Sequence, residues 1–201
     1  LMLLASAATT TTTIKLATTS YLLTLRNPLQ AAEQVAVLDQ LSGGRVLLGV
    51  GRGYAPEMLR AFHVPVAEKR RIFAWTLGLM KDAWAGAAIS LDGEAENAVK
   101  VYPLPVQRPH PPIWVAAFGP KALAQAGRLG LPYLSSPMES MTTLAANYAK
   151  HQQASVEEGV AGETTWRPMM ADLRLGAYWE IVSTTASPNA SRWSSHVVSL
   201  R

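Results

Sequence analysis

The chain has 201 residues and a formal net charge of +4, and 49% of it is apolar, a composition typical of a globular protein. It contains no cysteine, which excludes disulfides, thiolate metal sites and a cysteine nucleophile and favours a reducing, cytoplasmic setting. No basic run is interleaved with aromatics and no apolar run reaches transmembrane length, so we expect neither nucleic acid nor a membrane as a partner.

The amino-terminal part predicts a helix, a loop and a strand. We interpret residues 1–8 as the end of a helix and residues 9–13 as a loop. The stretch from Ile14 to Leu23 is rich in apolar and β-branched residues, which predicts one strand. Small polar residues at 18–20 would let a ligand approach its backbone closely, and a merely tolerated polar patch is the alternative.

A helix is predicted to begin at Pro28. Asn27 suits the N-cap and proline suits the first helical position. The helix ends at Gly43 and Gly44, because glycine readily adopts the left-handed conformation that closes helices. Its predicted core stripe consists of Ala31, Val35, Leu38 and Leu41.

The next strand, residues 46–50, is apolar throughout. A strand without polar alternation is typical of a parallel sheet that is covered on both faces. With the preceding strand and helix it forms one βαβ unit, which predicts a right-handed crossover. Gly51, Arg52 and Gly53 then lie at the carboxyl edge of the sheet, where ligands bind in α/β folds. We therefore predict that Arg52 binds a phosphate.

Two helices are expected next, over residues 56–61 and 68–84. The core stripe of the longer one is predicted to be Ile72, Trp75, Leu79 and Ala83. Arg70 and Arg71 lie in its first turns, where the helix dipole does not favour cations. That placement indicates an anionic partner, and a solvated surface pair is the commoner alternative.

Residues 85–111 look irregular, with a short strand over 99–102. A buried strand over 113–117 then leads through Phe118, Gly119 and Pro120 into a helix over 121–128. A free helix N-terminus at the carboxyl edge of a sheet binds anions, so this strand end is a second candidate for phosphate contacts. The next predicted elements are a strand over 133–135 and a helix over 142–159, and residues 167–175 are a candidate for one more strand. We predict one domain over residues 1–163 and a divergent or poorly ordered tail over 164–201.

Familiar catalytic and metal-binding motifs are missing from the sequence. The glycines at 49, 51 and 53 lack GxGxxG spacing and no helix opens directly on the last of them, which argues against a Rossmann site. The four histidines lack ligand spacing, so we expect no metal site, and the catalytic residues are unknown. The residues by themselves predict a phosphate-bearing ligand on a parallel α/β sheet and no particular reaction.

Three segments together resemble the bacterial luciferase-like flavin-dependent monooxygenases. They are RNPLQAAEQVAVLDQLSGGRVLLGVGRGY (26–54), FHVPVAEKR (62–70) and PPIWVAAFGPKALAQAGRLGLP (111–132). Their order and spacing match the family through about residues 10–160. The resemblance implies a TIM-type (β/α)8 barrel that is incomplete in this chain, which spans roughly barrel strands three to seven.

The resemblance also implies a flavin site. Reduced FMN, as a bound cofactor or a diffusing cosubstrate, or alternatively a deazaflavin, would place its phosphate at Arg52 and Arg70. Backbone donors would come from the turn 118–120, where Phe118 and Gly119 depart from the polar residues usual in the family. The Thr19–Ser20 bond matches the position of a cis peptide under the flavin ring. The family's catalytic groups lie largely on the first two barrel strands, which this chain lacks.

The implied function is that of a flavin-dependent monooxygenase that uses reduced FMN and O2 on a small organic substrate, inactive as this fragment. The alternatives are a deazaflavin-dependent reductase or dehydrogenase of the same fold and a non-catalytic flavin-binding module. The resemblance further implies a flavin reductase as electron donor and a dimeric full-length protein.

Overall fold

The computed structural model describes residues 1–136 and 139–160, so the predicted tail at 164–201 lies outside the described part. At its centre is strand β3 (Val46–Gly51), which is buried along its whole length. β1 (Leu16–Ala17) pairs with the start of β3 and β2 (Tyr21–Leu22) with its end. β6 (Ile113–Ala116) pairs with the middle of β3, and β7 (Tyr133–Leu134) pairs with β6. All of these pairings are parallel, as the βαβ interpretation predicts.

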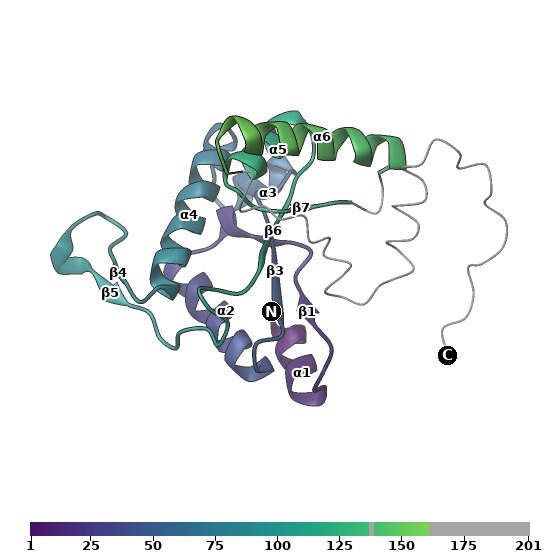
Figure 1. Ribbon diagram of the computed structural model, residues 1–201. Helices are drawn as coiled ribbons and strands as arrows, with labels where there is room; N and C mark the ends of the chain where they lie inside the picture. Colours follow the sequence, from purple (N-terminus) through teal and green to yellow (C-terminus); the bar gives the residue numbers. More distant parts are fainter. Residues whose placement is uncertain (137–138, 161–201) are drawn as a thin grey trace.

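Helices cover this curled sheet and connect its strands (Figure 1). α2 and α4 pack against each other, and the indole of Trp84 in α4 donates to the Ala32 carbonyl of α2 at 3.0 Å. α5 and α6 pack together beside β6 and β7. The helices are α1 (Met2–Thr10), α2 (Pro28–Ser42), α3 (Pro56–Ala61), α4 (Lys69–Trp84), α5 (Pro120–Arg128) and α6 (Met141–Glu157). Three 3-10 turns complete the set: η1 (Leu23–Leu25), η2 (Val66–Glu68) and η3 (Ala95–Asn97). A parallel sheet curled under helices is the arrangement of an incomplete (β/α)8 barrel, as predicted.

The prediction of a single strand over residues 14–23 is wrong in one respect. The structure divides it into β1 and β2, and the Thr19–Ser20 peptide between them is cis, as the family resemblance implies. The interruption arises because residues 18–20 press against β3, where the Thr18 hydroxyl donates to the Gly49 carbonyl at 2.8 Å. Side chains on β3 would block this approach: a Cβ at Gly49 would lie 2.1 Å from the Thr18 carbonyl oxygen.

The predicted core stripes need two corrections. On α4 the buried side chains are Phe73, Thr76, Leu77, Met80, Ala83 and Trp84, whereas Trp75 is 43% exposed. The predicted stripe lies about one residue out of phase with the buried face. A shift of one residue turns a helix face by roughly 100°. On α2, Leu41 is exposed and Asp39 is buried instead. Asp39 turns inward because its carboxylate accepts the backbone N–H and the side-chain amide of Gln107.

The region 85–111, predicted to be irregular apart from a strand at 99–102, contains an antiparallel hairpin. β4 (Ala88–Ile89) pairs with β5 (Val99–Lys100), and the hairpin projects from the body beside α4 (Figure 1). Its tip is held by Asp92, which accepts hydrogen bonds from the side chains of Ser90 and Asn97. Two strands of two residues are too short for a periodic signal, so the sequence pattern missed the pairing.

Candidate functional site

Arg52 follows β3 directly and lies at the carboxyl edge of the sheet, as predicted. Its side chain is only 8% exposed. The guanidinium lies over the ring of Phe73, 5.8 Å from the centroid, and its Nη1 donates to Gln125 Oε1 at 2.9 Å. The Thr24 hydroxyl donates to the Arg52 carbonyl at 2.7 Å, which fixes the backbone. Arg52 is therefore held in one place by contacts from three neighbouring elements.

The charge of Arg52 is not balanced by an acid. Among the described residues the ion pairs are Arg60–Glu57 and Arg71–Glu68, and neither includes Arg52. Burial lowers the pKa of the Arg52 guanidinium, and the nearby positive charge of Arg70 lowers it further. A buried cation beside a second cation is costly unless an anion compensates both. The arrangement is therefore a candidate anion site.

Gln125 connects the two arginines and was not identified from the sequence. While its Oε1 accepts from Arg52, its Nε2 donates to the Arg70 carbonyl at 2.9 Å. One amide thus orients the Arg52 guanidinium and ties it to the first turn of α4. The available signal was a glutamine between Leu123 and Ala126 on the buried face of α5.

The glycines that flank Arg52 have separate roles. A Cβ at Gly51 would lie 2.6 Å from Ser20 Oγ, so the bare backbone lets Ser20 approach the end of β3. Gly53 has a φ of +76°, which favours glycine, and its carbonyl accepts from Lys69 Nζ at 3.3 Å. Lys69 is a further cation at this edge that sequence reasoning missed. The structure thus brings Ser20 and the 51–53 segment together.

The turn 118–120 lies at the end of β6, the parallel neighbour of β3, and hence at the same edge of the sheet. Gly119 has a φ of +78° and precedes α5 without a side-chain cap. Both Ala122 and Leu123 donate their N–H groups to the Gly119 carbonyl. Since Pro120 has no N–H, Lys121 is the first-turn residue whose N–H is not committed in this way. The backbone donors implied for this turn therefore stay a prediction that rests on the N–H groups of Phe118, Gly119 and Lys121.

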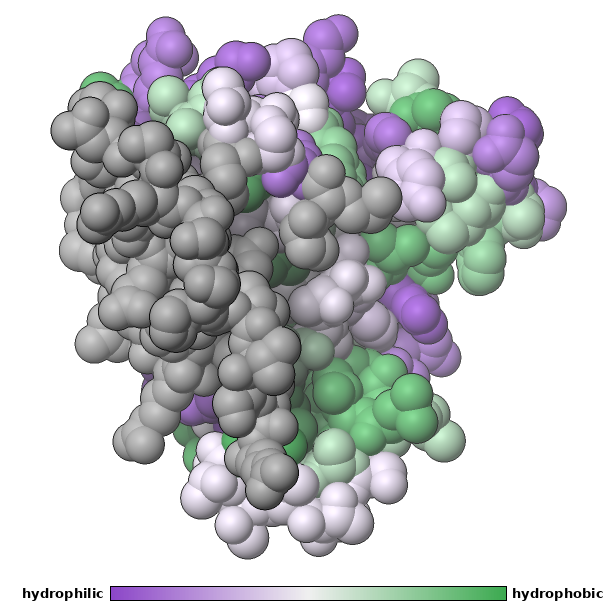
Figure 2. All heavy atoms as spheres, turned by 90° about the vertical axis from the view of Figure 1, so that its right-hand side faces the viewer, coloured by the Kyte–Doolittle hydropathy of each residue, from purple (hydrophilic) through white to green (hydrophobic). Residues whose placement is uncertain are grey.

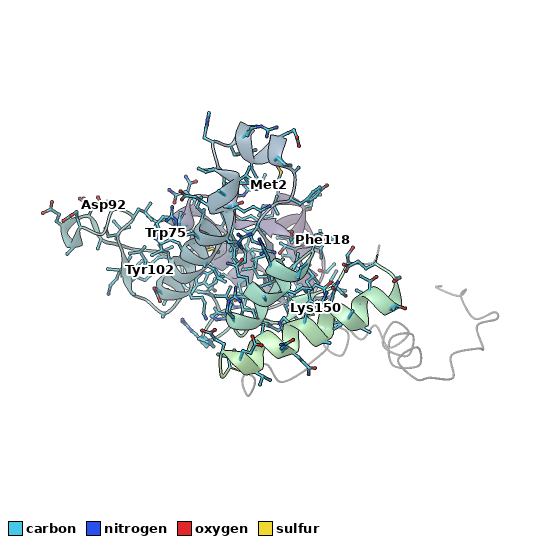
Figure 3. The ribbon with its side chains drawn as sticks, turned by 90° about the horizontal axis from the view of Figure 1, so that it is seen from above. Met2, Trp75, Asp92, Tyr102, Phe118 and Lys150 are labelled. Atoms are coloured by element: carbon cyan, nitrogen blue, oxygen red, sulfur yellow. The ribbon has the colours of Figure 1, made fainter. Side chains whose placement is uncertain are left out.

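Large side chains are exposed around this edge. Tyr54 follows Arg52 closely, Phe62 follows α3, and Phe118 follows β6; all three are exposed. Figure 3 looks down on the sheet from the top of Figure 1 and labels Phe118. Together with the anion site, these aromatics suit a ligand that carries a phosphate and a planar ring.

Within residues 1–136 and 139–160, no group of three or more His, Cys, Asp or Glu side chains is placed to hold a metal ion. No described helix is both long enough and apolar enough to cross a membrane.

Comparisons with known proteins agree with the fold. The sequence profile of the luciferase-like monooxygenase family matches residues 1–192. The monooxygenase RslO1 from Streptomyces bottropensis superimposes with a TM-score of 0.69 at 27% identity, covering 84% of this chain and 50% of that one. The FMN-bound oxygenating constituent of 3,6-diketocamphane monooxygenase from Pseudomonas putida shares the fold, with a TM-score of 0.67 at 22% identity over 79% of this chain and 48% of that one.

One curated relative depends on a different cofactor. The F420-dependent glucose-6-phosphate dehydrogenase of Kineococcus radiotolerans is 35% identical over 67% of this chain and 41% of its own length. The chain spans about half or less of the length of the proteins that it matches. The matched profile, the parallel strand order and the incomplete barrel lead to one conclusion: the chain belongs to the luciferase-like monooxygenase family.

Proposed function

We propose that this chain forms the cofactor-phosphate part of a flavin-dependent monooxygenase that uses reduced FMN and O2 to oxidise a small organic substrate. One observation carries the proposal: Arg52 is buried beside Arg70 and makes no ion pair with a described carboxylate. A phosphate at this edge would supply the missing counter-charge through charge-assisted hydrogen bonds.

The residues around Arg52 suit the binding of a flavin phosphate. Gln125 and Phe73 hold the guanidinium in place before the ligand arrives, so little side-chain entropy is lost on binding. Arg70 and Lys69 add positive charge from the start of α4. The segment around Thr19 and Ser20, which presses on the glycines of β3, would then lie under the ring. Gly51, Gly53 and the turn 118–120 would line the path between the phosphate and the ring.

Bound reduced flavin would supply the electrons for the activation of O2. This chain's own contribution is to bind and orient the cofactor, because none of its described residues is assigned to the chemical step. A separate flavin reductase would deliver the reduced cofactor.

A deazaflavin-dependent dehydrogenase is the second candidate, favoured by the 35% identity to an F420-dependent enzyme. The FMN reading is supported by charge. A phosphomonoester carries close to two negative charges at neutral pH, which suits the three cations at residues 52, 69 and 70.

A pair of titrations separates the two candidates. We expect FMN to quench protein fluorescence at lower concentration than F420, and Arg70→Ala to weaken FMN binding about tenfold or more. Arg71→Ala is the matched control, because the Arg71 side chain is already paired with Glu68. Tighter binding of F420, together with its reduction by a sugar phosphate, would establish the deazaflavin enzyme instead. Equal effects of the two arginine variants would contradict the phosphate assignment.

A further inference from the structure

The carbonyl of Arg52 lies just beyond the end of the sheet. The pairing of β2 with β3 ends at Leu22 and Gly51, and the pairing of β3 with β6 ends at Val50 on the β3 side. Neither of these two strands therefore supplies a ladder partner for this carbonyl. The Thr24 hydroxyl donates to it instead, at 2.7 Å. The peptide at the edge of the candidate site is thus held by a side chain.

Thr24 is well placed to hold this peptide rigidly. It lies in η1, which packs against α4, and it is only 5% exposed. A β-branched side chain has few χ1 rotamers, so burial leaves the hydroxyl little freedom to move. α4 also carries Phe73, over whose ring the Arg52 guanidinium lies. The same helix therefore supports both the backbone and the side chain of Arg52.

The bond from Thr24 fixes which end of the 52–53 peptide faces a ligand. This peptide is trans, and a trans peptide carries its C=O and N–H on opposite sides. Since the C=O points at Thr24, the N–H of Gly53 points away from it, and no described residue accepts a hydrogen bond from this N–H. Backbone N–H groups attract anions, whereas a carbonyl oxygen repels them. Thr24 therefore keeps the negative end of the peptide out of the site.

An anion would reach Arg52 from the carboxyl edge of the sheet, which lies toward the top of Figure 1. Figure 2, turned about the vertical axis, shows hydrophilic side chains gathered along this top. The Arg52 guanidinium is enclosed by Phe73 and Gln125, so it cannot swing outward to correct an error in its direction. Binding groups of this kind need neighbours that hold them in the productive geometry. The peptide at the base of the side chain has such a neighbour in Thr24.

We propose that Thr24 is a positioning residue of the phosphate site: its hydroxyl sets the 52–53 peptide and, through it, the direction in which Arg52 meets the phosphate. This inference rests on the proposed function. The alternative is a purely structural role, in which the hydroxyl only satisfies a buried carbonyl. Loss of the bond would then affect the binding of a flavin equally with and without a phosphate.

Calorimetric titration of the whole chain with FMN and with riboflavin tests the proposal. Thr24→Val keeps the shape of the side chain and removes its hydroxyl. We expect the affinity for FMN to fall about tenfold and the affinity for riboflavin to change less than about twofold. Thr24→Ser retains the hydroxyl and should keep most of the wild-type preference for FMN.

Thr76→Val is the matched control. Thr76 is a fully buried threonine of α4, and its hydroxyl has no hydrogen-bond partner within the described part of the chain. This substitution should leave the affinities for both flavins unchanged. Thr24→Ala removes the same hydroxyl as Thr24→Val with a smaller side chain and should have the same effect, so the test does not depend on the folding of one variant. Circular dichroism confirms that each variant folds.

A double-mutant cycle tests whether Thr24 acts through Arg52. In Arg52→Ala the preference for FMN should already be small, so adding Thr24→Val should change it little. A further tenfold loss of FMN affinity in the double variant would show that Thr24 acts without Arg52, and the proposal would be wrong.

The two flavins also separate this inference from the proposed function. If the wild type binds FMN and riboflavin equally, the phosphate site itself is wrong and the role of Thr24 falls with it. If the wild type prefers FMN and Thr24→Val retains that preference, only the role of Thr24 is wrong. Equal losses of affinity for the two flavins in Thr24→Val would show that the bond serves the fold alone.

Discussion

The anion site that we propose depends most on Gln125, because a buried guanidinium such as that of Arg52 binds an anion well only when its direction is fixed. Gln125 is neutral, so it orients the Arg52 guanidinium without neutralising its positive charge. A carboxylate at the same position would neutralise the site instead. The choice between an amide and an acid at one position therefore decides whether the edge of the sheet attracts anions.

Gln125→Glu tests this role. The new carboxylate should pair with Arg52 and compete with phosphate, so we expect FMN affinity to fall about thirtyfold or more while the fold is retained. Gln152→Glu, an exposed change of the same kind on α6, serves as the control. Fluorescence titration with FMN measures both, and equal affinities for the two variants would show that Gln125 does not orient the site.

Tyr133 gives a prediction about pH. Its hydroxyl donates to Glu139 Oε2 at 2.7 Å, and burial, with help from this hydrogen bond, raises the pKa of Tyr133 well above its ordinary value near 10. The pKa of Tyr133 is higher in the folded protein than in the unfolded chain. Its contribution to the free energy of unfolding is therefore complete below pH 10 and falls at higher pH, where the unfolded chain ionises.

Tyr133→Phe removes this dependence. We expect the variant to be about 1–2 kcal/mol less stable than the wild type at pH 8, through loss of the hydrogen bond to a carboxylate. At pH 11 this difference in the free energy of unfolding should be smaller by about 1.4 kcal/mol, because only the wild type loses stability as the tyrosine ionises. Urea unfolding at both pH values measures it, and a gap independent of pH would show that Tyr133 ionises normally in the folded protein.

At the scale of elements, the sheet is shaped by the close approach of residues 18–20 to β3. Gly49 and Gly51 permit this approach, and the interruption between β1 and β2 is its consequence. The part of the chain that we place under the flavin ring is thus formed by two segments that are about 30 residues apart in sequence.

Two glycine substitutions should change the stability of the fold in opposite directions. Gly49→Ala places its Cβ 2.1 Å from the backbone oxygen of Thr18, and we expect it to destabilise the fold by about 3 kcal/mol. Gly78→Ala meets nothing within 4 Å and should stabilise the helix by about 1 kcal/mol. Thermal unfolding at low protein concentration compares them. Similar melting temperatures for the two variants would contradict the close approach.

Elements with local signals were predictable from the sequence. The Asn27 side chain accepts from two N–H groups of α2, and Gly43 ends that helix with a φ of +61°, as their residue types predict. Arg52 was found because a glycine-flanked arginine follows an apolar strand. Two of the errors came from non-local contacts. Residues 18–20 break their strand only because β3 lies beside them, and Gln125 has a role only because Arg52 meets it 73 positions away.

At the scale of the whole molecule, the protein is a curled parallel sheet that forms part of a barrel, with Arg52, Lys69 and Arg70 at its carboxyl edge. The chain spans about half the length of its relatives, and the cofactor-phosphate site that we propose lies wholly within the part that it covers. The strand ends that would form this site are neighbours in the sheet, since β3 pairs with both β2 and β6.

The most direct test of this account compares FMN with riboflavin, which lacks the phosphate. Calorimetric titration of the wild-type chain should show FMN binding about 10 to 100 times more tightly than riboflavin, the contribution expected of charge-assisted hydrogen bonds to phosphate. In Arg52→Ala the preference should largely disappear, because FMN loses affinity and riboflavin does not, whereas Arg128→Ala on the exposed end of α5 should retain it. Undiminished FMN affinity in Arg52→Ala, or equal affinities of the wild type for the two flavins, would contradict the assignment of Arg52 as the phosphate ligand.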